Sequence, residues 1–251
     1  MKLDIQATPP ADFIALVWKE FFASQGRGVS MEAHFPWLDD GSAYFVTLRK
    51  DSEIIAGLAV REVSGAGSKV GLLGIVVVHP DHRGEGHSAT ILAHAIAEAE
   101  RRGLAELILW TGKPRVYEKM GFSVSDSGLF GEVRHPGGSV AFDTAPWSDK
   151  SRGVPPFARS LQRISTPAAS AVIIDGATVA EWTGEPEALL PLLASALPET
   201  FRLNALSGDA LVAAMIEAGW SVDLKPTRLQ MVCPLGGGAF EPPAFRLLDR
   251  V

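Results

Sequence analysis

Residues 74–103 decide the fold, and they read GIVVVHPDHRGEGHSATILAHAIAEAERRG. The segment opens inside a continuous apolar run, residues 70–78, which is rich in β-branched residues and ends just before Pro80. Such a run predicts a buried central strand that stops at the proline. Beyond the loop, apolar residues recur at helical spacing as far as Gly103, which fits a C-terminal cap. The predicted order is strand, glycine-containing loop, helix.

The loop at residues 83–88, RGEGHS, is suited to binding an anion. A helix N-terminus exposes unpaired backbone N–H groups and the positive end of the helix dipole. Glycines let a bulky group approach that backbone closely, so the pattern predicts a pyrophosphate site. A glycine pair can also serve turn geometry alone, and that structural alternative stays open at this point.

Two motifs give the loop a family context. RGEGHS resembles the (Gln/Arg)-x-x-Gly-x-(Gly/Ala) motif of the GNAT superfamily up to its last position, where Ser88 stands, and it follows a V-x-P spacing at Val78–Pro80. Residues 117–122, YEKMGF, resemble the Tyr-x-x-x-Gly-Phe element of the same superfamily. The resemblance spans about residues 8–145 and implies an acyl-CoA-dependent N-acetyltransferase.

The resemblance implies an α/β (α+β) fold, with a central, mixed, mostly antiparallel sheet flanked by helices. We expect a GNAT acetyltransferase domain at residues 1–147 and a smaller, degenerate GNAT-like domain at 148–251, after a proline-rich stretch. The second half repeats the element order of the first, which sets Met215 against Tyr117, but it lacks the glycine-rich loop. An unrelated α/β domain is the alternative for this half.

The cofactor site follows from the resemblance by position. The strand before the loop would offer backbone groups to the pantetheine arm and the thioester carbonyl, and the N–H groups that follow would wrap the pyrophosphate of acetyl-CoA. The predicted cofactor-binding residues are Val76, Val77, Val78, Arg83, Gly84, Glu85, Gly86, His87, Ser88 and Ala89.

Tyr117 and Glu62 are the two candidate catalytic residues. The resemblance gives Tyr117 the role of general acid toward the departing thiolate, against the alternative of a packed helix tyrosine. The acid that many relatives hold on a central strand is absent, and Trp110 stands where some relatives carry it. A water chain or Glu62 would deprotonate the amine, against the alternative that Glu62 is a solvated strand residue. Direct attack by the amine needs no enzyme nucleophile.

Composition and charge exclude several classes of partner. The formal net charge is −6 with scattered Lys and Arg, which disfavours a nucleic-acid partner. No signal pattern or apolar run of membrane-spanning length occurs, so we expect a cytoplasmic protein without membrane contact. The histidines show no zinc-ligand spacing, so no metal is expected. The single cysteine, Cys233, excludes an internal disulfide.

The expected acceptor is a primary amine on a small molecule or peptide, and acetyl is the default acyl group. Glu32, Asp39 and Asp40 would suit a cationic amine if they line the acceptor side, or they form a solvated surface. The second half would pack against the first and shape the acceptor pocket or a homodimer interface.

Two rival functions remain. Gly84-x-Gly86-x-x-Ala89 also fits a relaxed dinucleotide fingerprint, but five residues separate strand from glycine and no ribose-binding acid follows the next strand. A module that binds acyl-CoA or a partner protein without catalysis is the second rival, because the usual base is missing.

Overall fold

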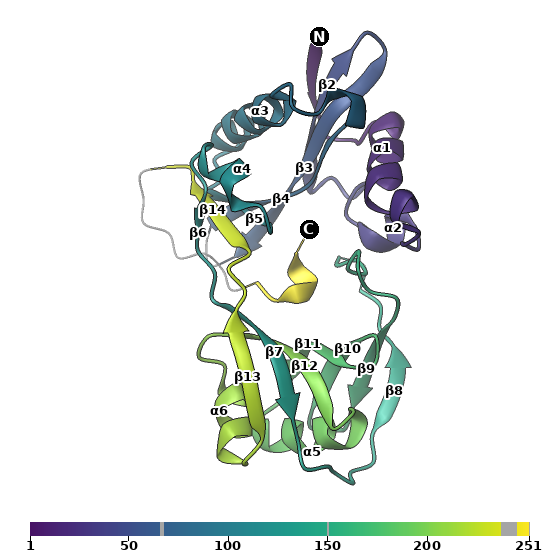
Figure 1. Ribbon diagram of the computed structural model, residues 1–251, viewed down its shortest axis with the longest axis vertical. Helices are drawn as coiled ribbons and strands as arrows, with labels where there is room; N and C mark the ends of the chain where they lie inside the picture. Colours follow the sequence, from purple (N-terminus) through teal and green to yellow (C-terminus); the bar gives the residue numbers. More distant parts are fainter. Residues whose placement is uncertain (66–67, 150, 237–244, 251) are drawn as a thin grey trace.

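The structure is a computed structural model that describes residues 1–65, 68–149, 151–236 and 245–250. Two seven-stranded sheets lie one beyond the other along the long axis of the molecule (Figure 1). Each sheet carries its own helices and its own apolar core. No described helix has the length and apolar character needed to cross a membrane.

The first sheet is mixed, and its β4–β5 pair is parallel while the other pairs are antiparallel. Helices α3 (His87–Arg101) and α4 (Pro114–Glu118) cover one face. Helices α1 (Ala11–Phe21) and α2 (Met31–His34) cover the other, joined by the 3-10 turn η1 (Ala23–Gln25) (Figure 1). In sheet order the strands are β1 (Lys2–Gln6), β2 (Ala43–Lys50), β3 (Glu53–Gly65), β4 (Ser68–Val78), β5 (Glu106–Trp110), β14 (Gln230–Pro234) and β6 (Ser123–Val124).

The second sheet repeats this plan. Its one parallel pair, β11–β12, brackets helix α5 (Pro186–Ala196) as β4–β5 brackets α3, and α6 (Ala210–Glu217) corresponds to α4. In sheet order the strands are β13 (Ser221–Pro226), β7 (Gly128–Arg134), β12 (Thr200–Leu206), β11 (Thr178–Thr183), β10 (Ser170–Ile174), β9 (Leu161–Ser165) and β8 (Asp143–Pro146). The predicted degenerate GNAT-like second half is therefore present as a second copy of the fold.

The two sheets exchange one strand each. β7 leaves the first half and inserts between β12 and β13, and β14 leaves the second half and inserts between β5 and β6. The sheets therefore do not follow the predicted boundary at residues 147/148, because β7 and β8 belong to the second sheet and β14 belongs to the first. The alternation of apolar and polar residues along a strand shows which of its sides faces a core. It does not show which of two sheets the strand joins.

Asp126 fastens the point where the two exchanged segments pass each other. Its carboxylate accepts hydrogen bonds from the Thr227 hydroxyl at 2.5 Å and from the backbone N–H groups of Gly128, Leu229 and Gln230 at 2.8, 2.7 and 3.2 Å. Burial alone would raise the pKa of Asp126, but these hydrogen bonds lower it below its usual value. One ionised side chain thus joins the segment before β7 to the segment before β14.

A bulge in β4 changes which face of the sheet the side chains at the end of that strand point to. Ile75 has a φ of 46°, and the register with β3 shifts at this point. Leu72 faces the α1 side before the bulge, whereas Ile75 and Val77 face that side after it. β4 and β5 pair only at Gly71–Leu107 and Leu72–Ile108, so the two strands separate beyond Leu72. The separation leaves an opening in the sheet beside the bulge.

Candidate active site

The loop before α3 presents a row of free backbone donors. Gly84 and Gly86 have φ values of 84° and 83°, and Gly86 caps the helix without a side-chain hydrogen bond. The N–H groups of residues 84–88 donate to no described residue. Ala89 differs from its prediction, because its N–H donates to the Gly86 carbonyl at 3.0 Å. Five consecutive donors at a helix N-terminus fit an anion such as a diphosphate.

Arg83 points away from these donors. Its guanidinium forms an ion pair with Glu20 of α1 at 2.7 Å, and its Nε donates to the Val78 carbonyl at 3.3 Å. The structure thus uses Arg83 to tie the loop to α1 and to the end of β4. Glu20 lies far from the loop along the chain, so no local sequence pattern links it to Arg83.

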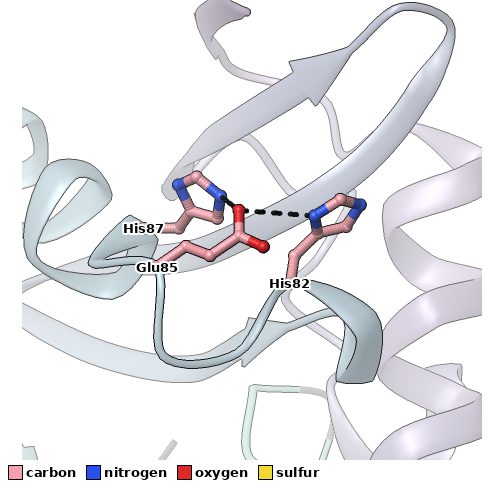
Figure 2. Close-up of side chains that lie close together, drawn as sticks. All are labelled: His82, Glu85 and His87. Carbon is pink, nitrogen blue, oxygen red and sulfur yellow. Dashed lines mark hydrogen bonds and ion pairs between the residues drawn. The ribbon is translucent and has the colours of Figure 1, made fainter.

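Three side chains gather within the loop, as Figure 2 shows. The Glu85 carboxylate lies 3.0 Å from Nε2 of the buried His87 and 3.6 Å from Nδ1 of His82. The hydrogen bond from His87 lowers the pKa of Glu85, and the nearby His82 acts in the same direction. The ligand atoms lie within 4.8 Å of one another, a set that could hold a transition metal ion. Their spacing in the sequence is His-x-x-Glu-x-His. The prediction that no metal binds did not take this spacing into account.

The predicted valines divide between the two faces of the sheet. Val76 and Val78 pack on the α3 side, against the same apolar cluster as Tyr117. Val77 packs on the α1 side. The loop, two of the valines and Tyr117 therefore share one face.

Tyr117 is packed by its ring and free at its hydroxyl. The ring meets Phe122 edge-on, with the centroids 6.0 Å apart, and no described residue hydrogen-bonds the hydroxyl. Burial raises the pKa of Tyr117, which keeps the phenol protonated and able to donate. The ring packing and the unengaged hydroxyl are compatible with both predicted roles.

Glu62 is not brought to this group of residues. Its carboxylate accepts from Arg102 at 2.8 Å, and Arg102 also binds Glu98 at 2.7 Å and lies over the Tyr44 ring. On β3, Glu62 pairs with Gly71, four residues along β4 from the bulge at Ile75. This ion-pair network gives Glu62 a structural partner at the C-terminal end of α3.

The comparisons with known proteins agree with this geometry. Residues 11–122 match the model of the acetyltransferase (GNAT) family, a little under half of the chain. These residues form a GNAT-family domain. No curated protein sequence matches the chain.

Solved structures resemble the whole two-sheet arrangement. A conserved protein from Enterococcus faecalis, a probable N-acyltransferase, is 13% identical with a TM-score of 0.68, over 94% of this chain and 73% of that one. GCN5-related N-acetyltransferases from Anabaena variabilis and Kribbella flavida are 12% and 16% identical, with TM-scores of 0.64 and 0.63. The first covers 94% of this chain and 73% of its own, and the second 93% and 72%. At these identities the likeness concerns the fold.

A pocket of about 300 Å³ lies on the opposite face of the GNAT domain from α3, where the first and second halves meet. Ile75 at the bulge and Trp110 at the end of β5 lie in its wall, which places the pocket at the opening between β4 and β5. Most of its wall is aromatic or proline. The lining residues are Phe21, Phe22, Arg27, Phe35, Ile75, Trp110, Pro155, Pro156, Phe157, Leu247 and Arg250.

The acidic residues Glu32, Asp39 and Asp40 do not line this pocket. Glu32 and Asp39 line a separate hollow beside the start of α1, and Asp40 lines neither cavity. Among the described residues, the wall of the 300 Å³ pocket carries two arginines and no carboxylate or imidazole.

A latch on α2 holds one wall of this pocket. The Nδ1–H of buried His34 donates to the Val154 carbonyl at 2.7 Å, and its Nε2 accepts from the Val29 N–H at 3.0 Å. The Val154 N–H donates to the Ala33 carbonyl at 2.9 Å. A Cβ on Gly153 would lie 1.8 Å from the His34 carbonyl oxygen, so only glycine allows this approach. The latch thereby fixes the chain that continues into Pro155, Pro156 and Phe157.

The second half carries the same framework without the same site. Trp220 N–H donates to the Met215 carbonyl as Phe122 N–H donates to the Tyr117 carbonyl, so the predicted alignment of Met215 with Tyr117 is structural as well. Only two residues separate β11 from α5, which begins at Pro186. Proline has no N–H, and Glu187 in the first turn would repel an anion, so this helix start cannot take the role of the loop before α3.

Proposed function

We propose that this chain is an N-acetyltransferase that moves an acetyl group from acetyl-CoA to a primary amine by direct attack. The observation that carries the proposal is the row of five free N–H groups at residues 84–88, on the same sheet face as the unengaged hydroxyl of Tyr117. The family match over residues 11–122 supports acyl transfer as the chemistry.

In this proposal the cofactor lies on the α3–α4 face. The diphosphate would accept hydrogen bonds from residues 84–88, and the pantetheine arm would run beside Val76 and Val78 toward the opening between β4 and β5. Backbone N–H groups of β4 that face the opening would stabilise the oxyanion formed during attack. The amine would approach from the pocket on the other face, so the two substrates meet at Ile75 and Trp110.

The proton balance assigns one role to the protein. The neutral amine bonds through its nitrogen to the acyl carbon, the carbon–sulfur bond breaks, and the thiolate takes a proton from Tyr117. The new amide nitrogen loses its extra proton to water, and Tyr117 regains a proton from water. We assign no base role to Glu62, because Arg102 engages its carboxylate. The pocket wall offers no other base among the described residues.

The same lack of a base favours a second candidate, a module that binds acyl-CoA without turnover. Both candidates require acetyl-CoA in the loop before α3, and only the first requires Tyr117. Turnover and binding must therefore be measured separately.

The test combines calorimetric titration of acetyl-CoA with an assay of CoA release over a panel of amines. Gly86→Glu places a carboxylate among the free N–H groups, and Gly208→Glu is its matched control in the second half. Both glycines have φ near 85° and open space around the new Cβ. We expect Gly86→Glu to weaken acetyl-CoA binding at least tenfold and Gly208→Glu to leave it within twofold.

Tyr117→Phe separates the two candidates. We expect it to lower kcat for CoA release on the order of a hundredfold while acetyl-CoA affinity stays within twofold. Binding without turnover on any amine, unaffected by Tyr117→Phe, supports the non-catalytic module. Unchanged affinity in Gly86→Glu contradicts the site itself.

A further inference from the structure

The pocket at the opening between β4 and β5 has a charge opposite to that of the whole chain. The chain carries a formal net charge of −6, whereas the pocket wall holds Arg27 and Arg250 and no acid among the described residues. A cationic pocket repels polycations and attracts anions. Polyamines and aminoglycosides are therefore poor candidates for the acceptor.

Arg250 lies in the wall and has no ion-pair partner among the described residues. Its guanidinium carbon lies 5.9 Å from the centre of the Trp110 ring, and its Nε is buried with no hydrogen-bond partner among the described residues. Asp126 and Asp249 are the nearest acids that act on it through space, but Asp126 is engaged by four hydrogen bonds. Asp249 accepts from the Arg246 N–H at 2.8 Å.

Trp110 supplies a second unused donor in the same wall. Its indole Nε1 is also buried without a described hydrogen-bond partner. Both nitrogens are closed off from solvent, so neither is open to a ligand in the pocket. The outer nitrogens of the Arg250 guanidinium have no described hydrogen-bond partner, and a guanidinium in a pocket wall binds a carboxylate.

The rest of the pocket wall indicates the size and polarity of the ligand. Four phenylalanines, Phe21, Phe22, Phe35 and Phe157, join Pro155 and Pro156 around about 300 Å³. This volume is at the lower end of small-molecule sites and fits one compact apolar group. The His34–Val154 latch holds the proline wall in place, so the pocket is built before the ligand arrives.

We propose that the acceptor is an amino acid with a large apolar side chain, whose carboxylate binds Arg250 and whose amine faces the opening at Ile75. This inference rests on the proposed acetyltransferase function and adds the substrate class to it. The adjoining cavity, which shares Phe157, Leu247 and Arg250 with this pocket, makes a longer peptide the alternative that the test must separate.

The test compares two amines that differ by a carboxylate. With acetyl-CoA saturating, we expect kcat/KM for L-phenylalanine to exceed that for phenethylamine at least tenfold. Arg250→Gln should remove this preference, chiefly by raising KM for phenylalanine. Arg163→Gln, an exposed arginine outside the pocket, is the matched control.

Binding of phenylalanine to the CoA-loaded protein, measured by calorimetry, keeps the two proposals distinguishable. Turnover of spermidine or a polycationic amine in preference to phenylalanine overturns the substrate class and leaves the acetyltransferase proposal standing. Phenylalanine binding that depends on Arg250, without turnover, supports the ligand class and contradicts the acetyltransferase. A preference for N-terminal phenylalanine peptides over the free amino acid also overturns the inference.

Discussion

Replacing Asp126 with alanine tests whether the strand exchange makes one cooperative unit of the two sheets. The carboxylate accepts four hydrogen bonds that join the segments before β7 and β14, and alanine would leave Thr227 and three N–H groups without that partner. Hydrogen bonds to a charged group contribute roughly 1.5–3 kcal/mol each in isolation, but they share one half-buried carboxylate, so we expect a total loss of about 3 kcal/mol. For a chain of this size that lowers Tm by roughly 6–12 °C.

Differential scanning calorimetry measures this effect, with Asp143→Ala on the exposed strand β8 as the control. We expect wild-type protein to unfold in a single transition, because each sheet contains a strand from the other half of the chain. The hydrogen bonds lower the pKa of Asp126, so its contribution is present above the pKa of an unfolded aspartate, near 4, and disappears as the pH falls through the folded value. The difference between wild type and Asp126→Ala should therefore shrink below about pH 4. A loss no larger than that of Asp143→Ala, or two separate wild-type transitions, would refute this reasoning.

Three further predictions follow from single groups. Burial raises the pKa of Glu106 to about 7, so the folded state keeps a proton that the unfolded chain releases, and stability should fall as the pH rises from about 4.5 to 7. Glu106→Gln should remove that slope in chemical denaturation and stabilise the protein at pH 8 by at most about 3 kcal/mol, and an unchanged slope would contradict the assignment. Gly153→Ala should raise KM for the acceptor amine at least fivefold with the Kd of acetyl-CoA unchanged, because the new Cβ collides with the His34 carbonyl; equal KM values would show that the latch does not shape the pocket. In a pH profile, kcat/KM should rise up to the pKa of the amine itself, since no described pocket residue can act as a base, and a plateau between pH 6 and 8 would reveal one.

The sequence was sufficient for the local pattern around the loop. The strand ending before Pro80, the helix ending near Gly103 and the GNAT fold are confirmed, because each depends on periodicity, caps and motif spacing within a short stretch. The repeated element order also predicted the second copy of the fold. These features need no knowledge of which segments meet.

The sequence alone could not predict which distant segments of the chain pair or contact each other. The exchange of β7 and β14 depends on which sheet edge each strand joins, and short strands of similar composition fit either. The bulge at Ile75 places a β-branched residue at positive φ, which no local rule predicts. Arg27 and Arg250 line one pocket from opposite ends of the chain, whereas Glu32 and Asp39 line a different hollow, and no local pattern indicates either grouping.

A crystal structure of the protein with acetyl-CoA bound tests the proposed site most directly. We predict the diphosphate within hydrogen-bond distance of the N–H groups of residues 84–88, the sulfur near the hydroxyl of Tyr117, and the acetyl group at the opening beside Ile75. A cofactor bound elsewhere, or a loop before α3 that stays empty at saturating acetyl-CoA, would contradict it.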